Sequence, residues 1–487
     1  MSDRLRVLFV ASECVPFAKA GGLGDVVGAL PRALEREGHD VRVVIPRYDT
    51  IKTAGMQKHP APLGVPTGVG EMWCAVWETR LPDSDVPVYM LDHAQLFGRG
   101  YIYDPPGRAA SDNLLRFSFL SRGALQVCRG LQWIPDVLHV HDWPTALVPV
   151  YTNTTDARDF ARTASVLTLH NVAHQGMFPA EHLRFTGLGA GVFHERGLED
   201  RGAINTLKGG LYHATKLTTV SPRYSAEVRA PAGGMGLEGV LNFRGADLIG
   251  ILNGIDEDIW DPASDRHTPV HFDATDLAGK AQCKSALQRE LGLTESPETP
   301  LVAIISRMTK QKGTDVIAAA LDRLLGLGIQ IGMLGSGDPE HEAFFGMRSH
   351  RSGSQFRAWI GFNEPLSHRL EAGADLFLMP SRFEPCGLNQ MYSQRYGTLP
   401  IVRNTGGLHD TVEPFNPATG AGTGFRFDDL TPNALVSTVA WAVDTYRNHP
   451  WAFRKMQVRA MQRPFGWHVA ALQYLEVYRW ALAARRG

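Results

Sequence analysis

Three basic residues stand where the chain could hold an anion. Arg307 and Lys312 lie in residues 306–313 (SRMTKQKG), between a buried apolar run and a helical pattern. Arginine can hold two phosphate oxygens through parallel hydrogen bonds, and lysine adds a point charge. Lys19 would supply a third cation from the other half of the chain. Taken alone, residues 306–313 fit a phosphate clamp and a solvated basic loop equally well.

Paired glycines follow an apolar run in each half of the chain. The first pair lies in residues 19–25 (KAGGLGD) and the second in residues 404–408 (NTGGL). Each pair would place backbone N–H groups at the start of a helix, where the helix dipole favours an anion. Two tight turns without a ligand are the alternative, although the equivalent positions of the pairs favour a ligand. The glycine spacing does not fit G-x-G-x-x-G, and the sequence has no Walker A motif, which argues against a dehydrogenase or an ATPase.

Glu384 is the acidic candidate. It lies in residues 380–388 (PSRFEPCGL), after an apolar run and before a helical pattern. A carboxylate in such a place often does no more than complement the helix dipole. The functional alternative is a sugar contact, in which the backbone N–H groups of Cys386, Gly387 and Leu388 hold hydroxyl groups beside the carboxylate.

Histidines end two apolar runs in the first half. His139, His141 and Asp142 end one run, and His170 ends another. A His-x-His pair is compatible with a metal-dependent hydrolase, for which His170 could be a further ligand. This is the weaker interpretation, because such a site needs more ligands at other strand ends.

Short apolar runs that alternate with helical patterns must position these residues. The runs are continuous, without apolar/polar alternation, which is typical of parallel strands buried on both faces. Strands are therefore predicted at residues 5–11, 41–45, 137–140, 166–169, 217–220, 248–252, 301–305, 329–334, 356–360, 374–379 and 399–402.

Helical spacing between the strands completes the predicted fold. Val26, Leu30 and Leu34 recur every four residues before Gly38, and residues 314–325 behave similarly. The pattern predicts an α/β protein with two doubly wound, Rossmann-like domains. We expect one domain at residues 1–250 and the other at 251–464. Residues 465–487 would form a C-terminal helix that packs back on the first domain.

Charge and cysteine content limit the possible partners. The 487 residues include 49 Lys and Arg against 50 Asp and Glu. This balance gives no electrostatic basis for binding nucleic acid or an anionic membrane. The five cysteines form no C-x-x-C pair, which fits a reducing cytoplasm. The N-terminus reads as a buried strand rather than a signal peptide, and no apolar run is long enough to predict a membrane span.

Taken together, these segments resemble bacterial glycogen (starch) synthases nearly from end to end. The resemblance implies a GT-B fold with two Rossmann-like domains facing each other across a central cleft. The first domain would be on the acceptor side, and the second would bind the nucleotide sugar. The motifs that carry the resemblance are KAGGLGDV at 19–26, HDW at 141–143, HN with QG at 170–176, ILNGID at 251–256, SRMTKQKG at 306–313, PSRFEPCGL at 380–388 and NTGGLHDTV at 404–412.

The resemblance also implies how the donor's nucleotide is bound. Lys19 contacts the donor, and Gly22 lies near its phosphates. Arg307 and Lys312 clamp the pyrophosphate. Phe362 stacks on the base, where the family often has tyrosine.

The sugar-binding residues follow from the same resemblance. Glu384 lies at the glucose, and His170 lies beside the reacting carbon. Asp142 and Asn253 line the sugar site. Further donor contacts are expected from Cys386, Gly387, Leu388, Thr405 and Gly406.

Two other positions depart from the family pattern. Ala20 stands where threonine is common. Pro144 follows HDW where histidine or glutamine is common, a departure that bears on one acceptor or sugar contact and not on the reaction.

The expected activity is transfer of glucose from ADP-glucose to the non-reducing end of an α-1,4-glucan such as glycogen, with retention of configuration. No cofactor or metal is expected, and the oligomeric state stays open. Retention often uses a carboxylate nucleophile. No second carboxylate is evident, so we favour front-face attack, with the leaving phosphate taking the acceptor's proton. The alternatives are another GT-B glucosyltransferase, which would use UDP-glucose or form sucrose or trehalose, and a non-catalytic glycan-binding relative.

Overall fold

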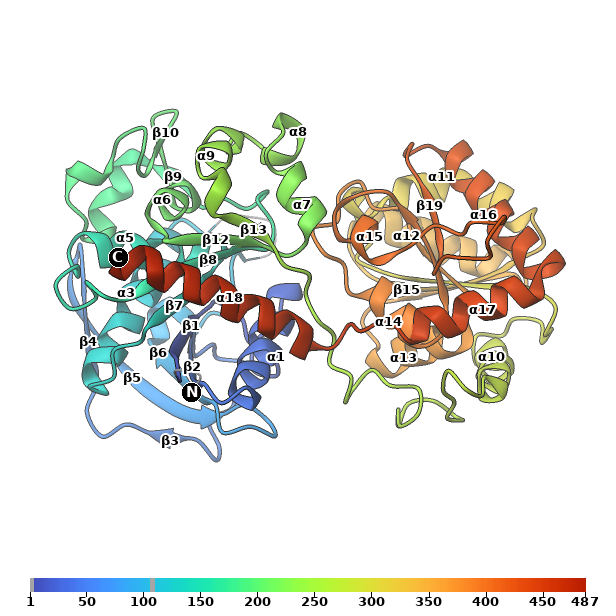
Figure 1. Cartoon of the computed structure of the whole chain (residues 1–487), viewed down its shortest axis with the longest axis horizontal. Coiled ribbons are helices and arrows are strands. Elements are labelled where there is room, and N and C mark those ends of the chain that lie inside the picture. The colour runs from blue at the N-terminus through green and yellow to red at the C-terminus, as the bar shows by residue number, and fades with distance from the viewer. Residues whose placement is uncertain (1–3, 106–109) are drawn as a thin grey trace. The chain divides into compact units, whose positions relative to one another are not determined.

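The computed structural model describes residues 4–105 and 110–487. The chain forms two compact units, one made of Met1–Gly254 with Trp467–Gly487 and the other of Ile255–Gly466 (Figure 1). The divisions thus follow residues 254 and 466, where the sequence suggested 250 and 464. Helix α18 (Trp467–Arg486) belongs to the first unit and packs there against α1 and β8.

The first unit is built on a ten-stranded sheet in the order β13-β12-β8-β7-β1-β2-β6-β5-β3, with β4 paired to β5. Neighbouring strands from β13 to β6 are parallel, whereas β5 pairs antiparallel with β6, β3 and β4. The strands are β1 (Arg6–Val10), β2 (Asp40–Pro46), β3 (Gln57–Lys58), β4 (Leu63–Thr67), β5 (Gly70–Arg80), β6 (Pro87–Asp92), β7 (Val137–His141), β8 (Ala164–Leu169), β12 (Lys216–Thr219) and β13 (Leu248–Gly250).

A small antiparallel sheet and the helices complete the first unit. The small sheet has the order β10-β11-β9, with strands Glu199–Asp200, Ala203–Asn205 and Met177–Pro179. The helices before α18 are α1 (Gly22–Arg36), α2 (Ala94–Phe97), α3 (Asn113–Gly130), α4 (Asp142–Thr145), α5 (Leu147–Asn153), α6 (Thr206–His213), α7 (Pro222–Glu227), α8 (Pro231–Gly234) and α9 (Glu238–Phe243).

The second unit has a six-stranded sheet in the order β16-β15-β14-β17-β18-β19, and every neighbouring pair is parallel. Its strands are β14 (Leu301–Ile305), β15 (Gln330–Gly335), β16 (Phe356–Ile360), β17 (Leu376–Met379), β18 (Leu399–Arg403) and β19 (Phe425–Phe427). Its helices are α10 (Ala278–Glu290), α11 (Thr314–Leu325), α12 (Pro339–Arg351), α13 (Glu364–Gly373), α14 (Asn389–Arg395), α15 (Gly406–Thr411), α16 (Pro432–Asn448) and α17 (Pro450–Met461).

The predicted fold class is confirmed, and each predicted strand is present. The reason is visible in β14, whose side chains alternate between two hydrophobic cores. Val302 and Ile304 pack in one core with residues of α11 and α16. Leu301 and Ala303 pack in the other with residues of α10 and α13. A strand covered on both faces must be apolar throughout, and this produces the continuous runs seen in the sequence.

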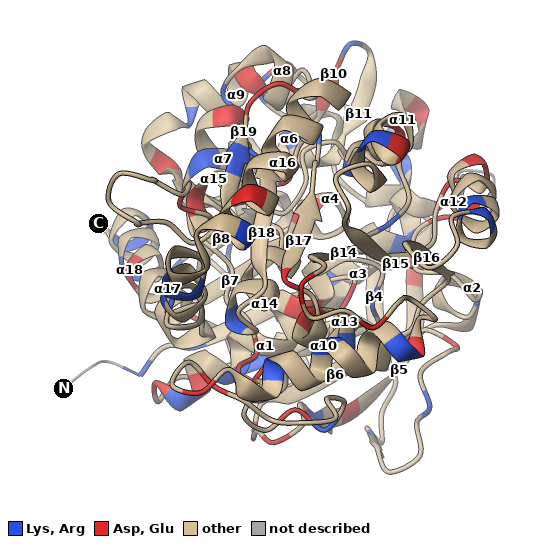
Figure 2. Ribbon diagram, turned by 90° about the vertical axis from the view of Figure 1, so that its right-hand side faces the viewer, with Lys and Arg blue, Asp and Glu red and all other residues tan. Residues whose placement is uncertain are grey.

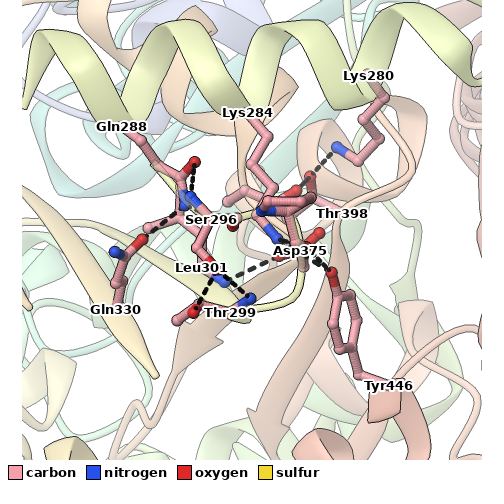
Figure 3. Close-up of polar contacts among 12 residues, drawn as sticks. Lys280, Lys284, Gln288, Ser296, Thr299, Leu301, Gln330, Asp375, Thr398 and Tyr446 are labelled. Carbon is pink, nitrogen blue, oxygen red and sulfur yellow. Dashed lines mark hydrogen bonds and ion pairs between the residues drawn. The ribbon is translucent and has the colours of Figure 1, made fainter. Parts of the chain in front are cut away.

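A buried polar network holds the starts of three strands in the second unit (Figure 3). Lys284 of α10 forms an ion pair of 2.7 Å with Asp375, which also accepts a hydrogen bond of 2.9 Å from the backbone N–H of Leu301. One helical turn earlier, Lys280 donates to the Thr398 hydroxyl at 2.7 Å. Leu301, Asp375 and Thr398 lie at the starts of β14, β17 and β18, the edge opposite to the strand ends from which the predicted site residues follow.

Charge is mixed over the surface helices. Figure 2 shows acidic and basic residues side by side on α11 and α12. Over residues 4–105 and 110–487, no helix is both long and apolar enough to cross a membrane.

Candidate functional site

In the first unit, the glycine turn that carries Lys19 links β1 to α1. The buried Glu13 carboxylate accepts hydrogen bonds from the backbone N–H groups of Ala20 at 2.5 Å and Gly21 at 2.8 Å. These two N–H groups are therefore engaged within the protein. The free N–H groups at the start of α1 begin at Gly22, and a Cβ there would meet no atom within 4 Å. The open space beside Gly22 leaves room for a ligand.

A cavity of about 550 Å³ adjoins the Lys19 turn. The Tyr103 hydroxyl donates a hydrogen bond to Glu13 and so joins the segment that follows α2 to the glycine turn. Lys19 itself forms an exposed ion pair of 2.7 Å with Asp25, which a bound anion would have to displace. The cavity is lined by Phe17, Ala18, Lys19, Ala20, Tyr48, Thr50 and residues 100–104.

Sequence reasoning missed Glu13 and Tyr103. The two residues are 90 positions apart in the sequence, and only the fold brings them into contact. The aromatic residues at 101 and 103, next to a glycine at 100, were the one local signal available.

Asp142 and His170 are brought together at the ends of the neighbouring parallel strands β7 and β8. The backbone N–H of His170 donates to Asp142 Oδ1 at 2.7 Å, and that of Asn171 donates to the same atom at 3.4 Å. Asp142 has a left-handed backbone conformation with φ of 52°. Burial raises the pKa of its carboxyl to about 7, and the hydrogen bonds from the two N–H groups oppose this rise. Asp142 thus holds the turn that carries His170.

The ring of His170 contacts a second histidine. Its Nε2 lies 3.1 Å from Nδ1 of His141. Burial lowers the pKa of His170 to about 3, so the ring is neutral at physiological pH. His170 can therefore act as a neutral hydrogen-bonding group but not as a cation.

The structure does not favour the metal-hydrolase interpretation of His139 and His141. His139 Nδ1 lies 2.7 Å from the Tyr478 hydroxyl, and its Nε2 lies 2.6 Å from the Thr168 hydroxyl. Both of its ring nitrogens are thus engaged by protein groups. Across the described part of the chain, no group of three or more His, Cys, Asp or Glu residues is arranged to hold a metal ion.

Asn253 lies just beyond β13 and is buried. Its Oδ1 is buried and has no hydrogen-bond partner among the described residues. A buried amide oxygen without a partner is costly unless a ligand supplies the donor.

In the second unit, Lys312 and Glu384 form an ion pair. Lys312 Nζ lies 2.6 Å from Glu384 Oε2, and both side chains are largely buried. The Ser381 hydroxyl donates to the same oxygen at 2.9 Å. The two residues follow β14 and β17, which are parallel neighbours, so their carboxyl ends meet at one edge of the sheet.

The second glycine pair packs directly onto the loop that contains Glu384. The N–H of Gly407 donates to the Glu384 carbonyl at 3.0 Å. Gly406 has φ of 43°, and a Cβ there would clash with the Glu384 carbonyl oxygen. A Cβ on Gly407 would clash with the Cys386 carbonyl oxygen. These glycines are therefore required by close packing of two backbones, whereas Gly22 is not, so the two pairs are not equivalent as the sequence suggested.

The remaining candidates of the second unit differ in exposure. Arg307 is exposed, and its guanidinium makes a long hydrogen bond of 3.5 Å to Gln311. Phe362 lies beyond the end of β16 and is 88% exposed. An aromatic ring with this exposure is available to a ligand. Cys386, Gly387 and Leu388 lie between Glu384 and α14, and Thr405 directly precedes α15.

Family models match both units. The starch synthase catalytic domain matches residues 6–243, and the glycosyl transferases group 1 model matches residues 292–455. Glycogen synthase 1 of Geobacter metallireducens is 49% identical, covering 99% of this chain and 97% of that protein. Glycogen synthase of Treponema denticola is 45% identical over 97% of this chain and 98% of that protein.

Solved structures give the same result. The catalytic domain of starch synthase IV from Arabidopsis thaliana, bound to ADP and acarbose, matches with a TM-score of 0.92 at 34% identity and covers 99% of this chain and 100% of that chain. Sucrose-phosphate synthase from Thermosynechococcus elongatus shares the fold, with a TM-score of 0.61 at 17% identity over 98% of this chain and 100% of that chain. The chain belongs to the glycogen and starch synthase family of glycosyltransferases, which have the GT-B fold.

Proposed function

We propose that this protein transfers glucose from ADP-glucose to the non-reducing end of an α-1,4-glucan, with retention of configuration. The observation that carries the proposal is the joined group of Lys312, Glu384 and the glycine turn at 406–407, at the carboxyl ends of β14, β17 and β18. The relatives named glycogen synthase and the starch synthase solved with ADP and acarbose support this donor and acceptor.

Cations and backbone N–H groups would hold the donor's pyrophosphate. Arg307 supplies an exposed planar guanidinium, which could bind two oxygens in place of its long bond to Gln311, and Lys312 adds a second charge. Lys19 and the N–H of Gly22 would also contact the donor. This arrangement stabilises the charge that builds on the leaving phosphate. Phe362, which is widely exposed, would stack on the base.

The transferred glucose would lie among polar groups whose own contacts hold them in place. Glu384 is fixed by Lys312 and Ser381, and His170 is fixed through Asp142. Asn253 Oδ1 would accept a hydrogen bond from a sugar hydroxyl, since this atom has no partner among the described residues. The backbone N–H groups of residues 386–388 would hold further hydroxyls. Thr405 and Gly406 would make other donor contacts, since the N–H of Thr405 itself donates to the Arg403 carbonyl at 2.9 Å. The first unit would also bind the acceptor, and the second unit would bind the nucleotide sugar.

Front-face attack fits the state of the two carboxylates. Asp142 is engaged by backbone N–H groups, and Glu384 is paired with Lys312, so neither is an unencumbered nucleophile. In the proposed step, the bond from the anomeric carbon to the phosphate oxygen breaks first. The acceptor's 4-hydroxyl oxygen then bonds to that carbon from the same face, and its proton passes to the departing phosphate.

The remaining features of the proposal concern the setting of the reaction. We propose that it needs no cofactor or metal and takes place in the cytoplasm. None of the five cysteines forms a disulfide, which is compatible with a reducing compartment. No nucleic-acid or membrane partner is proposed, because the net charge is near zero.

The test is incubation of the purified protein with glycogen and either ADP-glucose or UDP-glucose, in a chelator and without added metal. Nucleotide release and glucose incorporation are measured together. Primer-dependent incorporation from ADP-glucose is expected. Incorporation from UDP-glucose alone would correct the donor and leave the mechanism in place. Nucleotide release without incorporation into glycogen would indicate another acceptor, and no turnover of either donor would refute the proposed function.

A further inference from the structure

Three histidine rings lie in a row beside the proposed sugar site. The ring centroids of His139 and His141 are 4.4 Å apart, and those of His141 and His170 are 5.3 Å apart. His139 is fully satisfied by the hydroxyls of Tyr478 and Thr168. His141 Nδ1 and His170 Nε2 lie 3.1 Å apart, so a hydrogen bond between them requires one nitrogen to carry a proton and the other to accept it. The tautomers of these two rings therefore depend on which nitrogen is the donor.

The second nitrogen of His141 decides which atom donates. His141 is fully buried, and its Nε2 has no hydrogen-bond partner among the described residues. If His170 donated, neutral His141 would carry its proton on Nε2 and bury an unpaired N–H. If His141 donates from Nδ1, its Nε2 is instead a bare acceptor. Unpaired buried N–H donors are the rarer of the two in folded proteins.

We propose that His141 is a positioning residue, which donates its Nδ1–H to His170 Nε2 and thereby fixes His170 as the tautomer with its proton on Nδ1. This inference rests on the proposed function, in which His170 meets the transferred sugar. His170 Nδ1 has no partner within the described parts of the chain, so it is the ring atom left for a substrate. The fixed tautomer gives the site a neutral N–H donor at that atom.

The same contact opposes protonation of His170. A second proton would go to Nε2 and face the N–H of His141, so two donors would meet. The other ionisable groups around the ring are Asp142, whose carboxylate binds the His170 backbone N–H, and His139 on the far side of His141. Glu13 and Tyr224 lie farther out, against Asp142. Burial lowers the pKa of both His170 and His141, in line with a neutral pair. A neutral ring is the useful form, because positive charge builds on the sugar as the phosphate departs.

The tautomer can be read directly in the wild-type protein. Histidine-selective ¹⁵N labelling gives separate signals for protonated and bare ring nitrogens, and the His170 signals are assigned by their loss in His170→Asn. We expect a protonated Nδ1 and a bare Nε2 between pH 6 and 8. A protonated Nε2, or an equal mixture of tautomers, would overturn the proposal. This measurement needs no turnover, so it stands even if the protein proves inactive with ADP-glucose.

Matched variants test the consequence for catalysis. His141→Ala should lower kcat about tenfold, the order expected for loss of one oriented hydrogen bond, with little change in KM for the donor. Activity should also fall between pH 7 and pH 5, because the N–H of His141 no longer opposes a second proton on His170 Nε2. His141→Asn, which keeps an N–H donor, should recover part of both effects.

His139→Asn is the control, since it alters a buried histidine two residues away that does not contact His170. It should lower thermal stability without a new loss of activity between pH 7 and pH 5. If His139→Asn and His141→Ala give the same pH profile, the effect of His141 is only structural and the proposal fails. If His141→Ala does not fold, the comparison of His141→Asn with His139→Asn decides in the same way.

Discussion

Replacement of one glycine in each pair by alanine separates ligand binding from packing. Gly22 lies at the start of α1, where a Cβ would meet no atom within 4 Å. Gly406 has a left-handed backbone, and a Cβ there would clash with the Glu384 carbonyl. The same chemical change should therefore act on the ligand in one case and on the fold in the other.

The magnitudes follow from these surroundings. Alanine in a left-handed conformation costs about 1–2 kcal/mol, and overpacking against a backbone adds about 1–3 kcal/mol. Gly406→Ala should thus destabilise the second unit by about 2–5 kcal/mol. For a unit of this size, each kcal/mol lowers Tm by about 2–4 °C, which gives a fall of roughly 4–20 °C. Gly22→Ala should instead leave stability unchanged or raise it by about 0.5–1 kcal/mol, because alanine restricts the unfolded chain.

The assay combines a thermal melt with steady-state kinetics. For Gly22→Ala, we expect a wild-type melt and a KM for ADP-glucose raised about tenfold or more, because the methyl group occupies the approach of the phosphates to the free N–H groups. An unchanged KM would refute the placement of the donor phosphates beside Gly22. A melting temperature of Gly22→Ala as low as that of Gly406→Ala would show that the space beside Gly22 is not open.

Three further predictions follow from the same contacts. Arg307→Ala should lower kcat about 10²-fold or more in a steady-state assay, and Arg307→Lys should recover only part of it because the planar fork is lost; a change in KM alone would contradict a transition-state role. Asp142→Asn keeps an acceptor for the backbone N–H groups but cannot ionise, and the carboxyl's raised pKa means that the folded protein binds its proton more tightly than the unfolded chain does. The stability that this proton gives to the wild-type protein is therefore lost as pH rises from about 4 to about 7. Denaturant melts should show the free energy of unfolding of Asp142→Asn rising relative to that of wild type over this range, by at most about 4 kcal/mol. A difference that does not change with pH would contradict a buried carboxyl with a raised pKa. Tyr103→Phe should raise KM for the donor, because it removes the hydroxyl that holds Glu13 beneath the glycine turn, whereas Tyr396→Phe, which also loses a bond to a buried carboxylate, should affect only the melting temperature; equal KM values in the two variants would count against a link from Tyr103 to the donor.

The parallel core of each sheet was predictable because its strands are covered on both faces. This reason fails for several of the strands that were not predicted, although β6 was also missed and is a buried parallel neighbour of β2. β5 and β4 pair antiparallel and expose one face, so their residues mix apolar and polar character. β19 has only three residues, FRF, and gives no run to detect.

The site was predictable only in part, for a similar reason. Arg307, Lys312 and Glu384 follow strands whose carboxyl ends converge in any parallel sheet, so their proximity follows from topology. The function of a glycine depends on what lies against it, and this differs between Gly22 and Gly406. Glu13 holds the glycine turn through hydrogen bonds to residues 20, 21 and 103, and no local sequence spacing predicts these contacts.

The polar network at the other edge of the second sheet bears on how this site is held. A shift of two residues returns each side chain to the same face of the sheet, so the apolar pattern of these strands does not by itself exclude such a shift. Hydrogen bonds are directional, and the ion pair of Lys284 with Asp375, together with the bond from Leu301, fixes the start of β14 relative to β17. β14 has five residues and spans about 16 Å, so a slip at its start would move its far end by the same amount. The Lys312–Glu384 pair forms just beyond those far ends, at 2.6 Å. The polar side chains beneath α10 thus set the register on which that pair depends, a task that the apolar cores on either side cannot perform.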